Sequence, residues 1–101
     1  MADVGRRLRL TGLVQGVFFR AWAQGEAREL GVSGWIRNCP DGSVEAHLSG
    51  DESAVERMVE RMRRGPSNAR IEDMIVEEEP PESPGRFEVR TSPPLSFRGG
   101  D

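Results

Sequence analysis

The feature that most constrains the fold is the order in which two hydrophobic patterns follow one another along the chain. Two segments, 20–30 and 51–64, carry apolar residues at helical spacing, and segments in which apolar and polar residues alternate lie on either side of each. A stripe at i, i+3 or i+4 and i+7 marks one buried helix face, whereas alternation marks a strand with one face on the core. The stripes are Ala23, Ala27 and Leu30 in the first segment, and Val55, Met58, Val59 and Met62 in the second. Both segments are therefore predicted helices.

The alternating segments are predicted strands, and their order defines a topology. They cover residues 7–14, 32–38, 43–49, 69–79 and 87–90, with a turn at 39–42 and a bulge near Asp73 and Met74. Without the last short strand the order is βαββαβ, the split-βαβ order of a ferredoxin-like sandwich. We therefore predict an α+β fold with two helices on one face of an antiparallel sheet. Residues 1–90 are predicted to form its single domain, with a loose start over residues 1–5. Residues 91–101 lack periodicity and are predicted to form a flexible C-terminal tail.

The charge balance argues against several kinds of partner. The formal net charge is −3, so the chain lacks the basic field of a general nucleic-acid binder or of a protein that binds anionic membranes. No run approaches the roughly 20 apolar residues of a membrane span. We expect no signal peptide either, because Arg6 and Arg7 are followed by an alternating segment. The expectation is a cytoplasmic monomer with no nucleic-acid or membrane partner.

Scarce residue types limit the available chemistry. All 14 basic residues are arginine, a bias that codon usage in a GC-rich genome or adaptation to heat would explain. Because the chain has no lysine, it cannot form a lysine Schiff base or use a P-loop lysine. The single cysteine, Cys39, and the single histidine, His47, cannot by themselves build a cysteine- or histidine-based metal site. We therefore expect no metal and no cofactor. His47 occupies the polar phase of its strand and is predicted to face solvent.

The stretch from Gly12 to Arg20 joins the first predicted strand to the first predicted helix. Glycine permits positive φ and close backbone approach, and a helix N-terminus offers unpaired N–H groups that favour an anion. Arg20 adds a planar, permanently charged guanidinium at the same place. The stretch is compatible with a cradle for an oxyanion such as phosphate, and equally with a tight turn beside a solvated Arg20.

Two motifs in this chain resemble the signatures of the acylphosphatase family. The first is Gly12-x-Val14-Gln15-Gly16-Val17-x-Phe19-Arg20, and the second is Gly34-Trp35-Ile36-Arg37-Asn38-x-x-x-Gly42-x-Val44, followed after five residues by Gly50. Pro66-x-x-Ala69-x-Ile71 and Phe87-Glu88-Val89-Arg90 also resemble the family, so the likeness runs from about Arg7 to Arg90. Two long signatures in the right order are far more specific than one short motif. The fold of that family is the ferredoxin-like sandwich predicted above.

The resemblance implies hydrolysis of small-molecule acyl phosphates to a carboxylate and inorganic phosphate, without a metal. It places the catalytic roles on Arg20 and Asn38. It also places a phosphate-binding loop on Gln15, Gly16, Val17, Phe18, Phe19 and Arg20. The side chains of Phe18 and Phe19 are expected to be core and loop anchors rather than substrate contacts. Cys39 lies outside the cradle and is not expected to be a nucleophile.

Two other functions fit the same topology. One is a non-catalytic anion-binding or regulatory module, which would bind phosphate without turnover. The other is an RNA-recognition domain, which would need exposed aromatic side chains on the central strands and a basic face. The acidic balance and the lack of tyrosine argue against the second.

Overall fold

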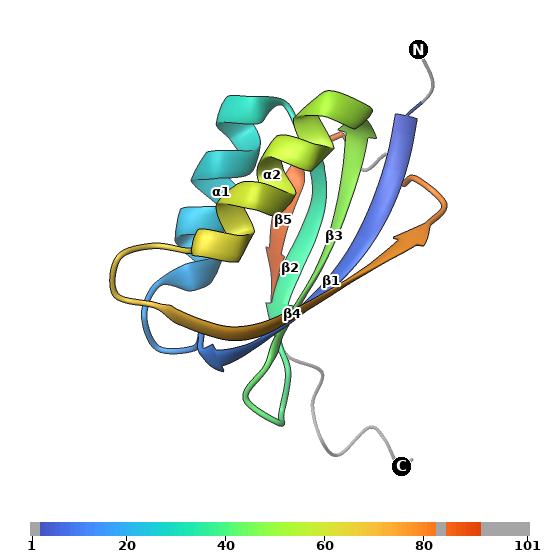
Figure 1. Ribbon diagram of the computed structural model, residues 1–101. Coiled ribbons are helices and arrows are strands. Elements are labelled where there is room, and N and C mark those ends of the chain that lie inside the picture. The colour runs from blue at the N-terminus through green and yellow to red at the C-terminus, as the bar shows by residue number, and fades with distance from the viewer. Residues whose placement is uncertain (1–2, 83–84, 92–101) are drawn as a thin grey trace.

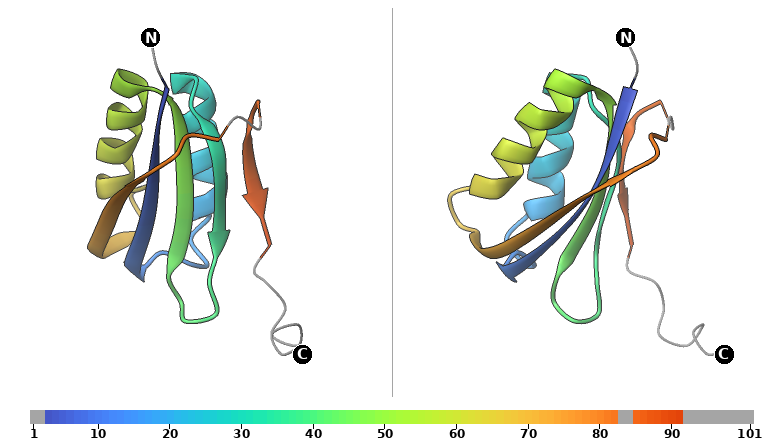
Figure 2. Two further views of the ribbon diagram at one scale, coloured as in Figure 1. Left: turned by 90° about the vertical axis from the view of Figure 1, so that its right-hand side faces the viewer. Right: turned by 45° about the vertical axis from the view of Figure 1, so that its right-hand side comes forward.

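The computed structural model describes residues 3–82 and 85–91 as one sheet covered by helices (Figure 1). In chain order, the elements of these residues are β1 (Asp3–Leu13), α1 (Phe19–Leu30), β2 (Ser33–Asn38), β3 (Val44–Asp51), α2 (Glu52–Arg64), β4 (Arg70–Glu79) and β5 (Phe87–Arg90). The strands lie side by side in the order β4-β1-β3-β2-β5. Both helices pack on one face of this sheet (Figure 2).

The pairing of the strands confirms the predicted ferredoxin-like α+β fold. β1 pairs antiparallel with β3 and with β4, and β2 pairs antiparallel with β3. β5 then adds itself beside β2 in parallel, so the sheet is mixed at this edge rather than wholly antiparallel. The short last strand therefore forms the edge of the sheet next to α1.

The core lies between the helices and the sheet. The predicted stripes supply its helical side, because Ala23 and Ala27 of α1 and Val55, Met58 and Met62 of α2 are all buried. The strands supply the other side through Leu8, Leu10, Ile36, Val44, Ala46 and Leu48, each fully buried. Asp51 caps α2 by accepting a hydrogen bond from the backbone N–H of Ser53 over 3.1 Å.

The first strand differs from its prediction at both ends. It begins at Asp3, so the loose start expected over residues 1–5 is wrong from residue 3 onward. At its other end Leu13 has 52% of its surface exposed, because it stands in the opposite phase of the strand to the buried Leu8 and Leu10. The register with β4 shifts between Thr11 and Gly12. The shift leaves Glu72 as the extra residue, one position from the predicted bulge. Gly12 has φ 121°, and a Cβ there would overlap the carbonyl oxygen of Arg70.

The segment that follows β4 crosses the sheet face opposite the helices (Figure 2). The backbone N–H of Glu82 donates to Ser49 Oγ of β3 over 2.7 Å. His47 lies beneath this crossing and is fully buried, so the prediction that it faces solvent is wrong. Its ring stacks on Trp35, with 6.3 Å between the ring centroids. A residue on the polar phase of a strand becomes buried here because a distant segment passes over it.

None of the helices described is both long and apolar enough to cross a membrane. The Pro80–Gly85 loop is described except for residues 83–84, and most of the predicted tail, residues 92–101, also lies outside the described part of the chain.

Candidate active site

The loop between β1 and α1 forms the floor of the site. Gly16 has φ 75°, and Phe18, the N-cap of α1, adopts the left-handed conformation with φ 60° and ψ 28°. Within residues 3–82 and 85–91, the backbone N–H groups of residues 15–20 donate to no other group of the protein. These amides stand at the positive end of the helix macrodipole. The loop therefore has the donors that an anion cradle requires.

Arg20 lies in the first turn of α1 and is partly buried. Its Nη1 donates to the carbonyl oxygen of Arg90 at the end of β5 over 3.3 Å. This contact holds the guanidinium between the helix and the edge strand, so the alternative of a freely solvated Arg20 does not fit. A guanidinium carries five N–H donors, so this one bond leaves others for an anion.

Gln15 fastens the loop to the neighbouring hairpin. Its Nε2 donates to the carbonyl oxygens of Cys39 and Ser43 over 2.9 and 2.8 Å. Both carbonyls belong to the connection between β2 and β3, which follows Asn38 directly. The side chain of Gln15 therefore positions the loop relative to the end of β2.

Asn38 is the last residue of β2, where it pairs with Val44 of β3. It lines the same cavity as the loop, so the tertiary structure brings the two sequence signatures together. This cavity has a volume of about 520 Å³. Its walls are Val14, Gln15, Gly16, Phe18, Phe19, Arg20, Ala21, Gln24, Asn38 and Val89. Of the residues predicted for the loop, Val17 alone is not in this wall; it packs against the core.

The cavity has a local charge opposite to that of the whole chain. Among the described residues that line it, Arg20 is the one formally charged side chain and none carries a carboxylate. Helix N-terminal amides add partial positive charge. An anion can therefore be attracted here although the chain as a whole carries a net charge of −3.

The two phenylalanines of the loop behave differently from each other. Phe19 is 2% exposed and packs edge-on against Trp22, with ring centroids 5.4 Å apart, as expected for a core anchor. Phe18 is 82% exposed and lines the cavity, so the expectation that its side chain is an anchor is wrong. Periodicity cannot separate adjacent residues of a loop, because a loop has no repeating face.

Four wall residues, Val14, Ala21, Gln24 and Val89, were not among the site residues predicted from the sequence. Val89 arrives through the parallel pairing of β5 with β2, in which it stands opposite Ile36. Gln24 projects from the second turn of α1, and its Nε2 donates to the carbonyl oxygen of Phe87 over 3.0 Å. No local pattern distinguishes these residues from ordinary members of a strand or a helix.

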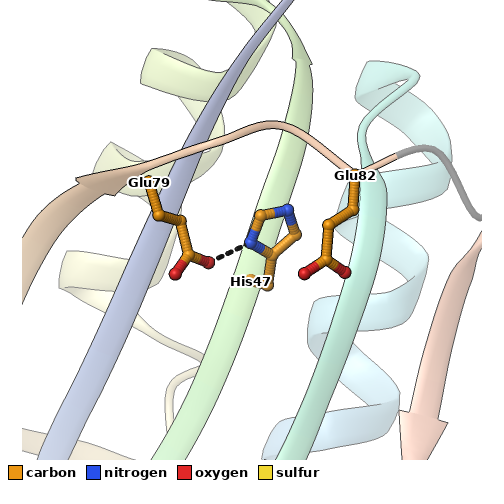
Figure 3. Close-up of side chains that lie close together, drawn as sticks. All are labelled: His47, Glu79 and Glu82. Atoms are coloured by element: carbon orange, nitrogen blue, oxygen red, sulfur yellow. Dashed lines mark hydrogen bonds and ion pairs between the residues drawn. The ribbon is translucent and has the colours of Figure 1, made fainter.

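His47, Glu79 and Glu82 form the one group of potential metal ligands found in the described ranges (Figure 3). One ligand atom of each lies within 4.8 Å of the others. However, Nδ1 of His47 already contacts Glu79, and its Nε2 lies 2.5 Å from Ser49 Oγ. Glu79 also pairs with Arg7 Nε over 3.2 Å. The group is best described as a hydrogen-bonded network that ties the crossing segment to the sheet, on the face away from the cavity.

Glu45 carries the clearest electrostatic effect on this open face. Burial alone would raise the pKa of its carboxyl group, but hydrogen bonds from Arg37 and Arg7 outweigh burial and hold the pKa below its ordinary value. The bonds are 2.7 Å long from Arg37 Nη2 and 2.7 Å from Arg7 Nη1. Glu45 therefore stays ionised and links two strands next to Trp35.

Comparison with known proteins places the chain in a family. The acylphosphatase family model matches residues 6–89. The chain belongs to the acylphosphatase family. A curated acylphosphatase of Rubrobacter xylanophilus is 51% identical over 85 residues, which cover 83% of this chain and 77% of the relative. A curated acylphosphatase of Rhizobium etli is 51% identical over 71 residues, covering 70% of this chain and 76% of the relative.

Solved acylphosphatases share the whole architecture. The structure from Coxiella burnetii superposes with a TM-score of 0.83 at 32% identity, covering 87% of this chain and 93% of that one. The structure from Bacillus subtilis gives a TM-score of 0.81 at 33% identity, covering 86% and 98%. The acylphosphatase fold therefore extends over nearly all of the described residues.

Proposed function

We propose that the cavity between residues 15–20 and Asn38 is where this chain carries out the reaction of its family. That reaction is the hydrolysis of an acyl phosphate to a carboxylate and inorganic phosphate. The observation that supports this site is the convergence of three features on one cavity: loop amides without a protein acceptor in the described ranges, the Arg20 guanidinium and the Asn38 side chain.

The loop amides and Arg20 hold the phosphoryl group. Phosphoryl transfer depends mainly on positioning and on stabilising charge over the phosphoryl oxygens, and it needs little covalent chemistry from the protein. Backbone N–H groups and a guanidinium supply charge-assisted hydrogen bonds that are already oriented before the reaction. Because the β5 carbonyl restrains Arg20, little ordering of this side chain is needed when the substrate binds.

Asn38 holds the attacking water. Its amide oxygen accepts a hydrogen bond from the water and its NH₂ group donates one, which orients the water for attack in line with the leaving group. The water oxygen forms a bond to phosphorus while the bond from phosphorus to the acyl oxygen breaks and the carboxylate leaves. Asn38 cannot take the proton, having no useful pKa, so the proton passes to an oxygen of the phosphoryl group.

An RNA-recognition function receives no support from the open face of the sheet. Trp35 on β2 is 5% exposed, and the guanidinium groups of Arg7, Arg37 and Arg90 lie over its ring at 4.9–5.4 Å. Base stacking needs an exposed aromatic platform. Among the residues that the structure describes, the large exposed aromatic is Phe18, which lies at the cavity instead. We therefore propose a small-molecule substrate and no nucleic-acid partner.

The remaining assignments extend this proposal to the whole chain. We place the catalytic domain in residues 1–90, since the family match ends at residue 89, and treat 91–101 as a tail outside it. We further propose that the protein acts as a cytoplasmic monomer without metal or cofactor. Light scattering of the purified protein tests the oligomeric state.

Release of phosphate from benzoyl phosphate by the wild type and by Arg20→Ala tests the site. Arg28→Ala is the matched control, because Arg28 is an exposed arginine of the same helix outside the cavity. We expect a loss of about 10²–10³-fold in kcat for Arg20→Ala and an unchanged rate for the control. Wild-type activity in Arg20→Ala would refute the site. Phosphate binding without turnover by the wild type would instead favour the regulatory module.

A further inference from the structure

The cavity has an apolar side that the phosphoryl chemistry does not use. Phe18, at the N-cap of α1, and Val89, on β5, both line it, and they are 82% and 41% exposed. They come from opposite ends of the chain and meet at the same opening as Arg20 and Asn38. An anion held by the loop would therefore have an apolar wall beside it.

Phe18 is unfavourable for stability in two independent ways. A bulky residue with φ 60° is rare, because the left-handed region crowds the Cβ atom. A largely exposed aromatic ring also gains none of the free energy that burial would give it. Neither feature anchors the loop, since Phe19 and the side chain of Gln15 already do so. Local strain retained at a site is a reason to look for function there.

Val89 is placed by the register of the edge strand. Phe87, two residues earlier on the same face, is 2% exposed in the core, whereas Val89 stands further along β5 and opens into the cavity. The parallel pairing of Ile36 with Val89 puts it one residue pair before the carbonyl of Arg90 that holds Arg20. The apolar wall and the proposed catalytic arginine are thus fastened to the same strand.

The size of the cavity leaves room for more than phosphate. A volume of about 520 Å³ lies within the range of sites that enclose whole small molecules, about 300–1,000 Å³. Arg20 is the single charged group among the described residues of the wall, and the phosphoryl group needs it. The Gln24 amide is engaged with Phe87. A second charge on the acyl group would therefore find no partner among these residues.

We propose that Phe18 and Val89 form an acyl-binding wall that selects acyl phosphates whose acyl group is aromatic or bulky and apolar. This inference rests on the proposed function, because it assumes that the phosphoryl group is bound by the loop. Phe18 covers one face of the acyl group and Val89 its edge. An acetyl group offers much less apolar surface to these two side chains than a benzoyl group, so it gains less free energy from contact with them.

The test compares benzoyl phosphate with acetyl phosphate by measuring kcat and KM from phosphate release. The variants are Phe18→Ala and Val89→Ala, and the control is Ile75→Ala, since Ile75 is 49% exposed on the opposite edge strand and outside this cavity. We expect the wild type to favour benzoyl phosphate. The ratio of the two kcat/KM values falls about tenfold in Phe18→Ala, mainly through KM for benzoyl phosphate, and by a smaller factor in Val89→Ala. The control keeps the wild-type ratio.

Several results would refute the proposal that Phe18 and Val89 form an acyl-binding wall. An unchanged ratio in both variants means that the acyl group touches neither side chain. An equal loss for both substrates in Phe18→Ala means that this residue shapes the loop instead of contacting the acyl group. A wild type that hydrolyses both substrates without preference refutes the inference and leaves the proposed function intact. A wild type that hydrolyses neither refutes the proposed function as well. Circular dichroism of each variant confirms that it is folded.

Discussion

Arg20 donates a hydrogen bond from Nη1 to the main-chain carbonyl oxygen of Arg90, with the two atoms 3.3 Å apart. Arg20 lies in the first turn of α1 and Arg90 is the last residue of β5, so the first helix and the last strand are joined at the cavity. The backbone of β5 is held in turn by parallel pairing with β2, the strand that ends at Asn38. The relative position of the two proposed catalytic residues therefore depends on an edge strand of four residues.

Shortening the chain tests this dependence. We expect a chain ending at residue 91 to keep wild-type activity, because the family match ends at residue 89. A chain ending at residue 85 loses β5, together with the core residue Phe87, and we expect it to lose both activity and much of its stability. Phosphate release and thermal unfolding of the two proteins provide the measurement. Full activity in the shorter chain would show that β5 does not position Arg20.

Two replacements of Asn38 separate its role in orienting the water from the effect of charge at this position. Asn38→Ala removes the groups that orient the water, and we expect kcat to fall by about 10²-fold. Asn38→Asp keeps the size of the side chain but adds a negative charge next to a bound phosphoryl group. We expect a larger loss in this variant, with a clear rise in KM, because like charges repel. Steady-state kinetics with benzoyl phosphate give both values. An Asp variant as active as the Ala variant would place residue 38 away from the phosphoryl group.

The Gln15 anchor predicts a combined effect on stability and binding. Gln15→Ala removes one of the two donors to each of the carbonyl oxygens of Cys39 and Ser43, which keep their bonds from the backbone N–H groups of Gly42 and Cys39. Each lost bond costs about 0.5–1.5 kcal/mol in the free energy of unfolding. The loop also loses its link to the hairpin, so we expect weaker competitive inhibition by inorganic phosphate. Urea unfolding and an inhibition series measure the two effects. Unchanged inhibition would mean that the loop keeps its shape through its backbone alone.

Glu45 predicts a pH dependence of stability with a defined sign. The folded state holds the pKa of Glu45 below its ordinary value. Its contribution is therefore complete above the unfolded pKa of about 4.3 and is lost as the pH falls from there through the folded pKa. We expect Glu45→Gln to lower the free energy of unfolding by about 1.5–3 kcal/mol at pH 7. The difference from the wild type should shrink below about pH 4. A constant difference across this range would exclude the ionised carboxyl as its cause.

The position of His47 predicts that its replacement lowers the stability of the fold but leaves the catalytic rate unchanged. Its buried ring contacts Glu79, Ser49 and Trp35 on the sheet face opposite α1. We expect His47→Ala to destabilise the fold by about 2–4 kcal/mol, because it leaves a cavity and unpaired polar groups. The kcat of the folded protein should stay within about twofold. We also expect a chelator to change neither Tm nor kcat of the wild type. A fall in Tm on chelation would assign a metal to His47, Glu79 and Glu82 instead.

The local patterns of the sequence determined the elements and the two signature motifs. The helical stripes and the apolar phases of β1, β2 and β3 reach the core as predicted, because the period of apolar residues reports which face of an element is buried. Arg20 and Asn38 belong to motifs whose spacing is a property of the chain itself. The resemblance of these motifs to the acylphosphatase signatures, and not their spacing alone, names the proposed catalytic pair.

Tertiary structure alone decided what lies over each face and what meets at the cavity. His47 is buried because a segment more than thirty residues further along the chain crosses its strand, as its contact with Glu79 shows. Phe18 is exposed because Phe19 takes the place in the core. Val89 reaches the cavity because β5 pairs with β2. A sequence pattern records the preference of a residue for water or for the core. The partner that satisfies this preference is set by pairings between distant parts of the chain.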